Sequence, residues 1–221
     1  QKQQFIDNFS HELRIPLTAI YGYAEYIQKA LMSEEERYEC TQFIMSECSR
    51  LQNMAYQLLD MALLRRDEMQ DNDCSIKELF AESQKAMHVR ASKKKIRLTY
   101  VLPQDYVVRG NMEQLLMLTN NLIDNAIKAS RQEDEIRISA YSEGAAIVME
   151  VEDHGTGMED EQISHIKEAF YRVDKARSRA AGGAGLGLAI CERIIQIHHA
   201  EMSFISEPEA GTIVKLSFPA E

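Results

Sequence analysis

The fold of the first third of the chain is decided by residues 5–31, which read FIDNFSHELRIPLTAIYGYAEYIQKAL. Apolar side chains recur in this stretch every three or four residues, the spacing that places them on one narrow side of an α-helix. The pattern therefore predicts a long amphipathic helix. The members of this first apolar stripe are Ile6, Phe9, Leu13, Leu17, Ile20, Ala24, Ile27 and Leu31.

A second apolar stripe with the same spacing follows, and it predicts a second helix. Between the two stripes, Ser33 can cap a helix whose first turn, 34–36, is acidic. Residues 1–66 are therefore predicted to form a helical hairpin. Because two helices alone bury little apolar surface, we expect a homodimer in which two hairpins pair as a four-helix bundle. The second stripe consists of Cys40, Ile44, Leu51, Met54, Leu58 and Met61, with Glu47 as its one polar member.

Residues 67–74 interrupt this pattern, and we interpret them as a linker to a second domain at 75–221. Helical and strand patterns alternate in that domain, with a hairpin turn at Glu143-Gly144. This order predicts an α + α/β chain, in which the helical hairpin precedes an α/β sandwich with helices on one face of a mixed sheet. The helices are expected at 77–92, 111–130, 159–168 and 186–199, and the strands at 95–102, 105–109, 134–142, 145–152, 201–206 and 211–218.

Composition excludes several classes of partner. The 221 residues carry a net charge of -10, which would repel a nucleic-acid backbone. No apolar run approaches the roughly 18–20 residues that span a bilayer, and no signal peptide is visible, so we expect no membrane contact by this fragment. Four scattered cysteines are expected to be reduced cytosolic thiols. The chain begins with Gln1, and we therefore expect it to be a fragment of a longer protein.

His11 is a candidate nucleophile. It lies on the side of the first helix opposite the apolar stripe, so we expect it to face solvent. Glu12 can accept a hydrogen bond from one ring nitrogen, which would leave the other nitrogen nucleophilic. Pro16 lacks an N–H, so the helix can bend just past the histidine. Isolated exposed histidines usually have no function, but these neighbours favour an acceptor of a phosphoryl group.

Two stretches of the second domain carry candidate nucleotide-binding groups. Asn121, Asn125 and Lys128 share one side of the helix at 111–130, where amide oxygens could ligate Mg²⁺ and the lysine could neutralise phosphate. Asp153-His154-Gly155-Thr156-Gly157-Met158 follows an alternating strand. Its carboxylate could accept a hydrogen bond from the exocyclic amine of adenine, which guanine lacks. Gly155 and Gly157 would let the backbone come close to the base.

A third stretch, Gly182-Gly183-Ala184-Gly185-Leu186-Gly187-Leu188, opens an apolar helix. The N–H groups at a helix N-terminus bind phosphate. The stretch is not a Walker A loop, because no Gly-Lys-Ser/Thr follows, and no strand directly precedes it as a dinucleotide site requires. The basic residues just before it predict a mobile, positively charged lid. They are Arg172, Lys175, Arg177 and Arg179.

Phe9-Ser10-His11-Glu12-Leu13-Arg14-Ile15-Pro16-Leu17-Thr18 resembles the phospho-acceptor motif of sensor histidine kinases. The three nucleotide-binding stretches, with Phe170-Tyr171-Arg172 before the third, resemble the N, G1, F and G2 boxes of the ATPase domain of that family. The resemblance covers essentially the whole chain. It implies the cytoplasmic core of a two-component sensor histidine kinase, with a Bergerat-type ATP-binding domain and a parent protein anchored in the bacterial inner membrane.

The resemblance also implies an activity and a set of site residues. His11, assisted by Glu12, would take a phosphoryl group from Mg-ATP and pass it to an aspartate of a response regulator receiver domain. Asn121 stands where related ATPases carry a water-activating Glu, and an amide is a poor base, which fits phosphoryl transfer better than ATP hydrolysis. Asn125 would ligate magnesium, Lys128 and Arg172 would face phosphates, Asp153 would read adenine, and Gly155, Gly157, Gly183, Gly185, Leu186 and Gly187 would complete the nucleotide site.

Two positions depart from the family pattern. Ile15 stands where many members carry Thr or Asn, thought to position water for dephosphorylating the partner, so we expect weak phosphatase activity. Ala129 stands where an aromatic residue often follows the lysine, so some packing near the nucleotide would be lost. Two alternatives stay open at this point. One is an ATPase or serine-directed kinase of the same superfamily, and the other is a signalling scaffold that does not use nucleotide.

Overall fold

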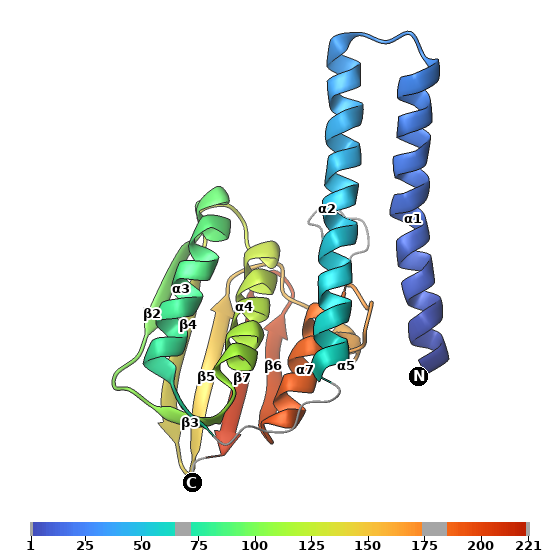
Figure 1. Cartoon of the computed structure of the whole chain (residues 1–221). Coiled ribbons are helices and arrows are strands. Elements are labelled where there is room, and N and C mark those ends of the chain that lie inside the picture. The colour runs from blue at the N-terminus through green and yellow to red at the C-terminus, as the bar shows by residue number, and fades with distance from the viewer. Residues whose placement is uncertain (1, 65–71, 174–184, 220–221) are drawn as a thin grey trace.

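The computed structural model describes residues 2–64, 72–173 and 185–219, in which a long helical hairpin stands beside an α/β unit (Figure 1). Helix α1 (Lys2–Lys29) and helix α2 (Glu34–Leu64) pack along each other as the hairpin. At the start of α2, the Ser33 hydroxyl accepts from the backbone N–H of Glu36, whose carboxylate accepts from the Ser33 N–H. These reciprocal bonds satisfy two donors at the helix end, and the predicted cap at Ser33 is confirmed.

The apolar stripes of the hairpin are only partly covered within one chain. Cys40 and Met54 of α2 are buried, whereas Ile6 and Leu17 of α1 are 46% and 54% exposed. Further large apolar side chains are exposed along both helices and in their connection, and a large exposed apolar surface commonly marks an interaction site. They include Tyr21, Leu31, Tyr38, Met45, Tyr56, Leu59 and Leu63.

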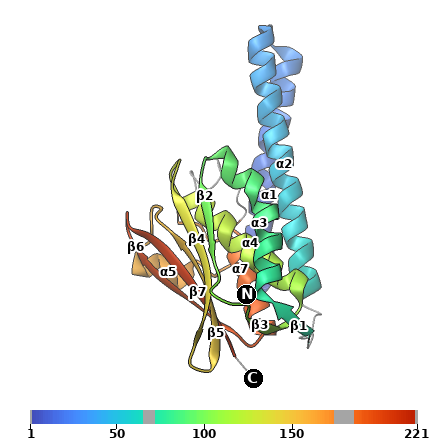
Figure 2. The same cartoon turned by 90° about the vertical axis from the view of Figure 1, so that its left-hand side faces the viewer.

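A five-stranded mixed sheet forms one layer of the α/β unit (Figure 2). Its first two strands, β2 and β4, run parallel, and every other neighbouring pair in it is antiparallel. The mixed sheet predicted from the sequence is therefore confirmed. In spatial order the strands are β2 (Arg97–Val101), β4 (Glu135–Glu143), β5 (Ala146–Asp153), β7 (Gly211–Pro219) and β6 (Glu201–Glu207).

Three helices cover one face of this sheet: α3 (Ile76–Lys93), α4 (Met112–Ala129) and α7 (Gly187–Ile197) (Figure 2). The short helix α5 (Asp160–His165) packs against β6. Helix α4 is capped by the Asn111 side chain, which accepts from the backbone N–H of Gln114, and it buries its apolar side against the sheet and its neighbours. The predicted layer of helices on one face is confirmed.

One pair of strands differs from the prediction. β1 (Asn72–Ser75) pairs antiparallel with β3 (Val107–Gly110) in a separate two-stranded sheet. The strand expected at 105–109 thus exists but lies outside the main sheet. Residues 72–74 of the expected linker form a strand because Cys74, opposite Val108, is buried with it in the core. The α/β unit therefore extends back to Asn72, and the rest of the expected linker, up to residue 71, lies outside the described residues.

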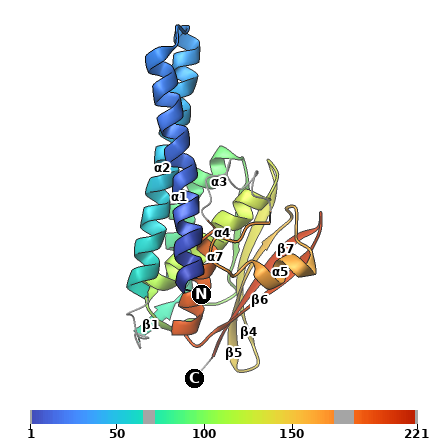
Figure 3. The same ribbon diagram turned by 90° about the vertical axis from the view of Figure 1, so that its right-hand side faces the viewer.

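Among the described residues, the hairpin contacts the α/β unit near the end of α2 and near the start of α1. Helix α2 packs against α7, where Arg193 Nε donates to the carbonyl oxygen of Leu64 at 3.2 Å. Near the start of α1, Phe170 lies against Phe5 and Phe9, with ring centroids 5.1 and 6.3 Å apart. Figure 3 shows this half of α1 passing in front of the α/β unit. None of the helices in the described ranges combines the length and apolarity that crossing a bilayer requires.

Candidate functional site

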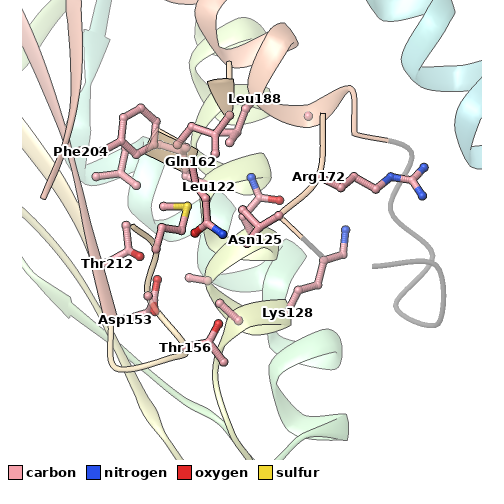
Figure 4. Close-up of a pocket in the computed structure, with 18 of the residues that line it drawn as sticks. Leu122, Asn125, Lys128, Asp153, Thr156, Gln162, Arg172, Leu188, Phe204 and Thr212 are labelled. Atoms are coloured by element: carbon pink, nitrogen blue, oxygen red, sulfur yellow. The ribbon is translucent and has the colours of Figure 1, made fainter. Parts of the chain in front are cut away.

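A cavity of about 550 Å³ lies between α4, α7, α5 and the sheet, and Gln57 of α2 reaches its edge. Figure 4 shows Asp153 and Thr212 at one end of this cavity and Arg172 at the other, with the Arg172 side chain directed away from Asp153. The cavity brings together most of the residues predicted to bind nucleotide. Those that line it are Asn121, Asn125, Lys128, Asp153, Gly157, Arg172, Gly185 and Gly187.

Asp153, the last residue of β5, forms the inner end of the cavity and is 7% exposed. Its Oδ1 accepts from the backbone N–H of Gly155 at 2.9 Å, and the backbone N–H of Thr212 also donates to the carboxylate. Burial raises the pKa of Asp153 to about 6, and the two backbone hydrogen bonds only partly oppose this rise. The backbone thus fixes a hydrogen-bonding carboxyl group in an apolar recess.

The glycines after Asp153 are required by the protein backbone. Gly157 has φ of +59°, and a Cβ atom there would lie 1.9 Å from the carbonyl oxygen of Glu207. A Cβ atom at Gly155 would lie 2.6 Å from the backbone of Ala129 at the end of α4. Gly155 is buried and does not line the cavity. These residues let the loop pack between α4 and the β6–β7 turn, and their predicted approach to a base stays a prediction.

Helix α4 presents amide groups and one cation to the cavity. Within the described residues the Asn125 amide forms no hydrogen bond, so it remains available to a ligand. The Asn121 amide nitrogen donates to the Met117 carbonyl at 2.9 Å. Lys128 Nζ lies 2.7 Å from the carboxylate of Asp124, which also pairs with Arg90 at 2.5 Å. The predicted phosphate-binding lysine is therefore held by an acidic side chain of its own helix.

The glycine-rich stretch opens α7 as predicted. The helix begins at Gly187, and its N-cap residue, Leu186, forms no side-chain capping hydrogen bond. Gly185 and Gly187 line the cavity, so backbone groups of this end face it. Leu186 is fully buried in the core, so its side chain packs the helix and does not line the cavity. Gly183 and three predicted lid cations, Lys175, Arg177 and Arg179, lie outside the described residues.

His11 is exposed on α1, as predicted, and the helix continues through Pro16. Glu12 was expected to bind the His11 ring, but in the structure its Oε2 accepts from two arginines instead. Arg50 Nη2 lies 3.1 Å away and Arg172 Nη2 lies 2.8 Å away. Arg172, expected to face phosphates, thus lines the cavity while its guanidinium is bound to the residue next to His11.

Sequence reasoning missed Arg50 and Asp124, which hold Glu12 and Lys128. The sequence does contain a signal for Arg50. Glu47 interrupts the apolar stripe, and a carboxylate in that position needs a nearby cation. In the structure Arg50, one turn further along α2, lies 3.4 Å from Glu47. Other residues that line the cavity were not predicted as site residues, and four of them are relevant to the shape of its walls. They are Met158, Gln162, Phe204 and Thr212.

Comparison with known families gives two matches. Residues 110–221 match the family described as histidine kinase-, DNA gyrase B-, and HSP90-like ATPase, and residues 1–67 match the His Kinase A (phospho-acceptor) domain. The sensor protein SrrB of Staphylococcus aureus is 31% identical over 223 residues, which cover 99% of this chain and 38% of SrrB. The chain therefore spans well under half the length of the curated relatives it matches.

Solved structures share the same fold. The histidine kinase ThkA, crystallised in complex with the response regulator protein TrrA, has a TM-score of 0.80 at 21% identity, covering 99% of this chain and 61% of the other. The Acinetobacter baumannii histidine kinase AdeS has a TM-score of 0.74 at 20% identity, covering 96% of this chain and 98% of the other. The hairpin followed by an α/β unit, predicted from the sequence, is the arrangement these proteins have.

Proposed function

Because the chain belongs to the histidine kinase-, DNA gyrase B- and HSP90-like ATPase family and carries a His Kinase A domain before it, we propose that it is the catalytic core of a sensor histidine kinase. It phosphorylates its own His11 with Mg-ATP and then transfers the phosphoryl group to an aspartate of a response regulator. The observation that carries this proposal is the pairing of a cavity ending in Asp153 with a solvent-exposed histidine in a phospho-acceptor motif.

The cavity suits an adenine nucleotide. At the inner end, the Asp153 carboxylate accepts a hydrogen bond from the exocyclic amine of the base, and Leu188 and Phe204 provide apolar walls farther from Asp153. Towards the outer end, Lys128 and the N-terminus of α7 favour phosphate. The Asn125 amide oxygen fits Mg²⁺, which prefers oxygen ligands and, when bound, neutralises phosphate charge. Asn121 lacks the basicity to activate water, which favours transfer over hydrolysis.

His11 supplies the nucleophile. Its ring nitrogen forms a bond to the γ-phosphorus while the bond from that phosphorus to the β,γ-bridging oxygen breaks, and ADP leaves with the electron pair. The second ring nitrogen keeps its proton, and Glu12 is placed in sequence to accept a hydrogen bond from it. His11 does not line the cavity, so transfer requires the α/β unit to dock on the hairpin in a second arrangement.

Assembly is part of the same proposal. The apolar side chains exposed along α1 and α2 favour pairing of two hairpins through residues 1–66, which would bury them in a four-helix bundle. The complex of ThkA with TrrA supports a response regulator as the partner of this chain. The parent protein would then be anchored in the bacterial inner membrane. We also propose weak phosphatase activity, because the aliphatic side chain of Ile15 cannot hold a water by hydrogen bonding.

The test is incubation with γ-labelled ATP. The chain should acquire a label that is acid-labile and base-stable, and His11→Gln should abolish it. His88→Gln is the matched control, because His88 is an exposed histidine on α3. Label persisting in His11→Gln would refute His11 as the acceptor. An acid-stable label would favour the serine-directed kinase, and a chain that binds no ATP would favour the scaffold.

A further inference from the structure

Four charged side chains form an alternating row where the hairpin meets the α/β unit. In order they are Arg172, Glu12, Arg50 and Glu47, and we call them the ionic row. Successive nitrogen–oxygen distances are 2.8, 3.1 and 3.4 Å. The two arginine side chains are 4% exposed and the two glutamates 14% and 16%, so solvent screens these contacts little. The two positive and two negative charges balance.

The two arginines are held differently. Arg50 lies on α2, inside the hairpin that also carries Glu12, and it is gripped by a carboxylate on each side. Arg172 is the one member of the row that comes from the α/β unit, and it also lines the nucleotide cavity. Phe170, two residues earlier, packs on Phe5 and Phe9 and keeps this segment against α1. Arg172 therefore stands between Glu12 and the place where nucleotide phosphates would lie.

We propose that Arg172 exchanges partners, leaving Glu12 for nucleotide phosphate, while Arg50 stays behind as the positioning residue for Glu12. This inference rests on the proposed function and concerns its regulation. Once Arg172 leaves, the remaining three members of the row carry one net negative charge. A carboxylate relieved of one of two guanidiniums is a better acceptor for a third donor, and the nearest candidate in sequence is the ring N–H of His11.

One exchange therefore has two effects. It adds positive charge at the phosphates, and it releases the carboxylate beside the acceptor histidine. Glu12 and phosphate compete for the same guanidinium, so Glu12 must weaken nucleotide binding, and nucleotide must weaken the Glu12–Arg172 contact by the same factor. A glutamate that served only His11 would have no effect on nucleotide affinity, and this difference makes the two roles separable.

The test measures affinity for a non-hydrolysable Mg-ATP analogue by calorimetry, using the whole chain. Glu12→Gln should bind the analogue at least about fivefold more tightly than the parent chain. In an Arg172→Gln background, the same Glu12→Gln change should have no effect. Unchanged or weaker binding by Glu12→Gln, or an equal gain in both backgrounds, would overturn the exchange. A parent chain that binds no analogue would instead defeat the proposed function itself.

Glu47→Gln is the matched control, because Glu47 belongs to the same ionic row but contacts Arg50 and not Arg172. Its affinity should stay within about twofold of the parent, and a gain equal to that of Glu12→Gln would count against the exchange.

A second measurement needs no glutamate variant. In the ¹⁵N-arginine-labelled parent chain, saturating analogue should shift the Arg172 side-chain Nε–H resonance more than that of Arg50, which keeps both of its glutamates. An unmoved Arg172 resonance would contradict the proposal.

Discussion

The two ends of the nucleotide cavity hold their charged groups in different ways. At the inner end, Asp153 is fixed by backbone N–H groups of Gly155 and Thr212. At the outer end, the cations Lys128 and Arg172 are bound by the side chains of Asp124 and Glu12. The inner end is thus ready for a ligand, whereas the outer end is already occupied by the acidic side chains of the protein.

This difference implies that the two ends respond to a ligand in different ways. Backbone donors cannot move away without unfolding the loop, so under the proposed function the inner end would bind the base with no rearrangement. Side-chain ion pairs can exchange one anion for another, so the outer end responds to phosphate by changing its internal contacts. Substitutions at the inner end should therefore lose affinity, and substitutions of the acidic residues at the outer end should gain it.

The largest effect is expected for Asp153→Asn. The amide cannot offer a charged acceptor to the adenine amine, and hydrogen bonds to charged groups contribute about 1.5–3 kcal/mol, so affinity for ATP should fall by about 10- to 150-fold. Calorimetric titration with ATP measures this loss. Asp160→Asn, an exposed change on nearby α5, is the control and should bind like the parent. Equal affinity of both variants would remove the claim that the inner end recognises the base.

The same Asp153→Asn substitution should stabilise the protein without ligand. The pKa of Asp153 is raised from 3.8 to about 6, so the folded state holds its proton more tightly than the unfolded chain does. Stability is therefore lost as pH rises from about 4 to about 6, by about 3 kcal/mol once the group is ionised. Urea unfolding of Asp153→Asn should show a gain of that order at pH 7.5 and almost none at pH 3.5. A gain independent of pH would contradict the stated cause.

A smaller effect is expected for Arg50→Met, which leaves Glu12 without its fixed partner. Phosphorylation of His11 should slow by about tenfold in kcat because Glu12 is misplaced, and KM for ATP should also rise, because Glu12 without Arg50 holds Arg172 more firmly. Arg50→Lys should recover part of the rate because it restores the charge. Arg37→Met, an exposed arginine on the same helix, serves as the control. A raised KM with unchanged kcat would show that Arg50 acts on the nucleotide and not on Glu12.

The smallest effect is expected for Asp124→Asn, which frees Lys128 at the outer end. Partly exposed ion pairs are worth at most about 1 kcal/mol, so affinity for an ATP analogue should rise by no more than about fivefold. Parallel titrations with Glu113→Gln, an exposed acidic residue in the first turn of α4, report the general effect of removing one negative charge. Weaker binding by Asp124→Asn would mean that Asp124 helps to bind the ligand, and the contrast between the two ends would fail.

Local patterns in the sequence predicted much of this structure. The spacing of apolar residues predicted both hairpin helices, and the Ser33 cap followed from one residue and the acidic turn after it. The predicted site residues of the three stretches also meet at one cavity, apart from Gly155 and Leu186, which do not line it, and Gly183, which lies outside the described residues.

The contacts that could not be predicted join residues far apart in the chain. Glu12 and Arg172 are 160 positions apart, and the pairing of β1 with β3 depends on burial of Cys74 against a strand more than thirty residues away. Charge alone does not tell which of several arginines an acidic residue will meet. The glycines near Asp153 illustrate the same limit, because the atoms that exclude a side chain there belong to Glu207 and Ala129.

Helix α7 is short, and it contacts both the cavity and the end of helix α2. Its first residue, Gly187, borders the cavity, and Arg193, less than two turns later, grips the last carbonyl group of α2. A twist of α2 about its own axis would therefore pull on the helix whose first residue borders the cavity. Movement of the hairpin and binding in the cavity would then both act through the position of α7.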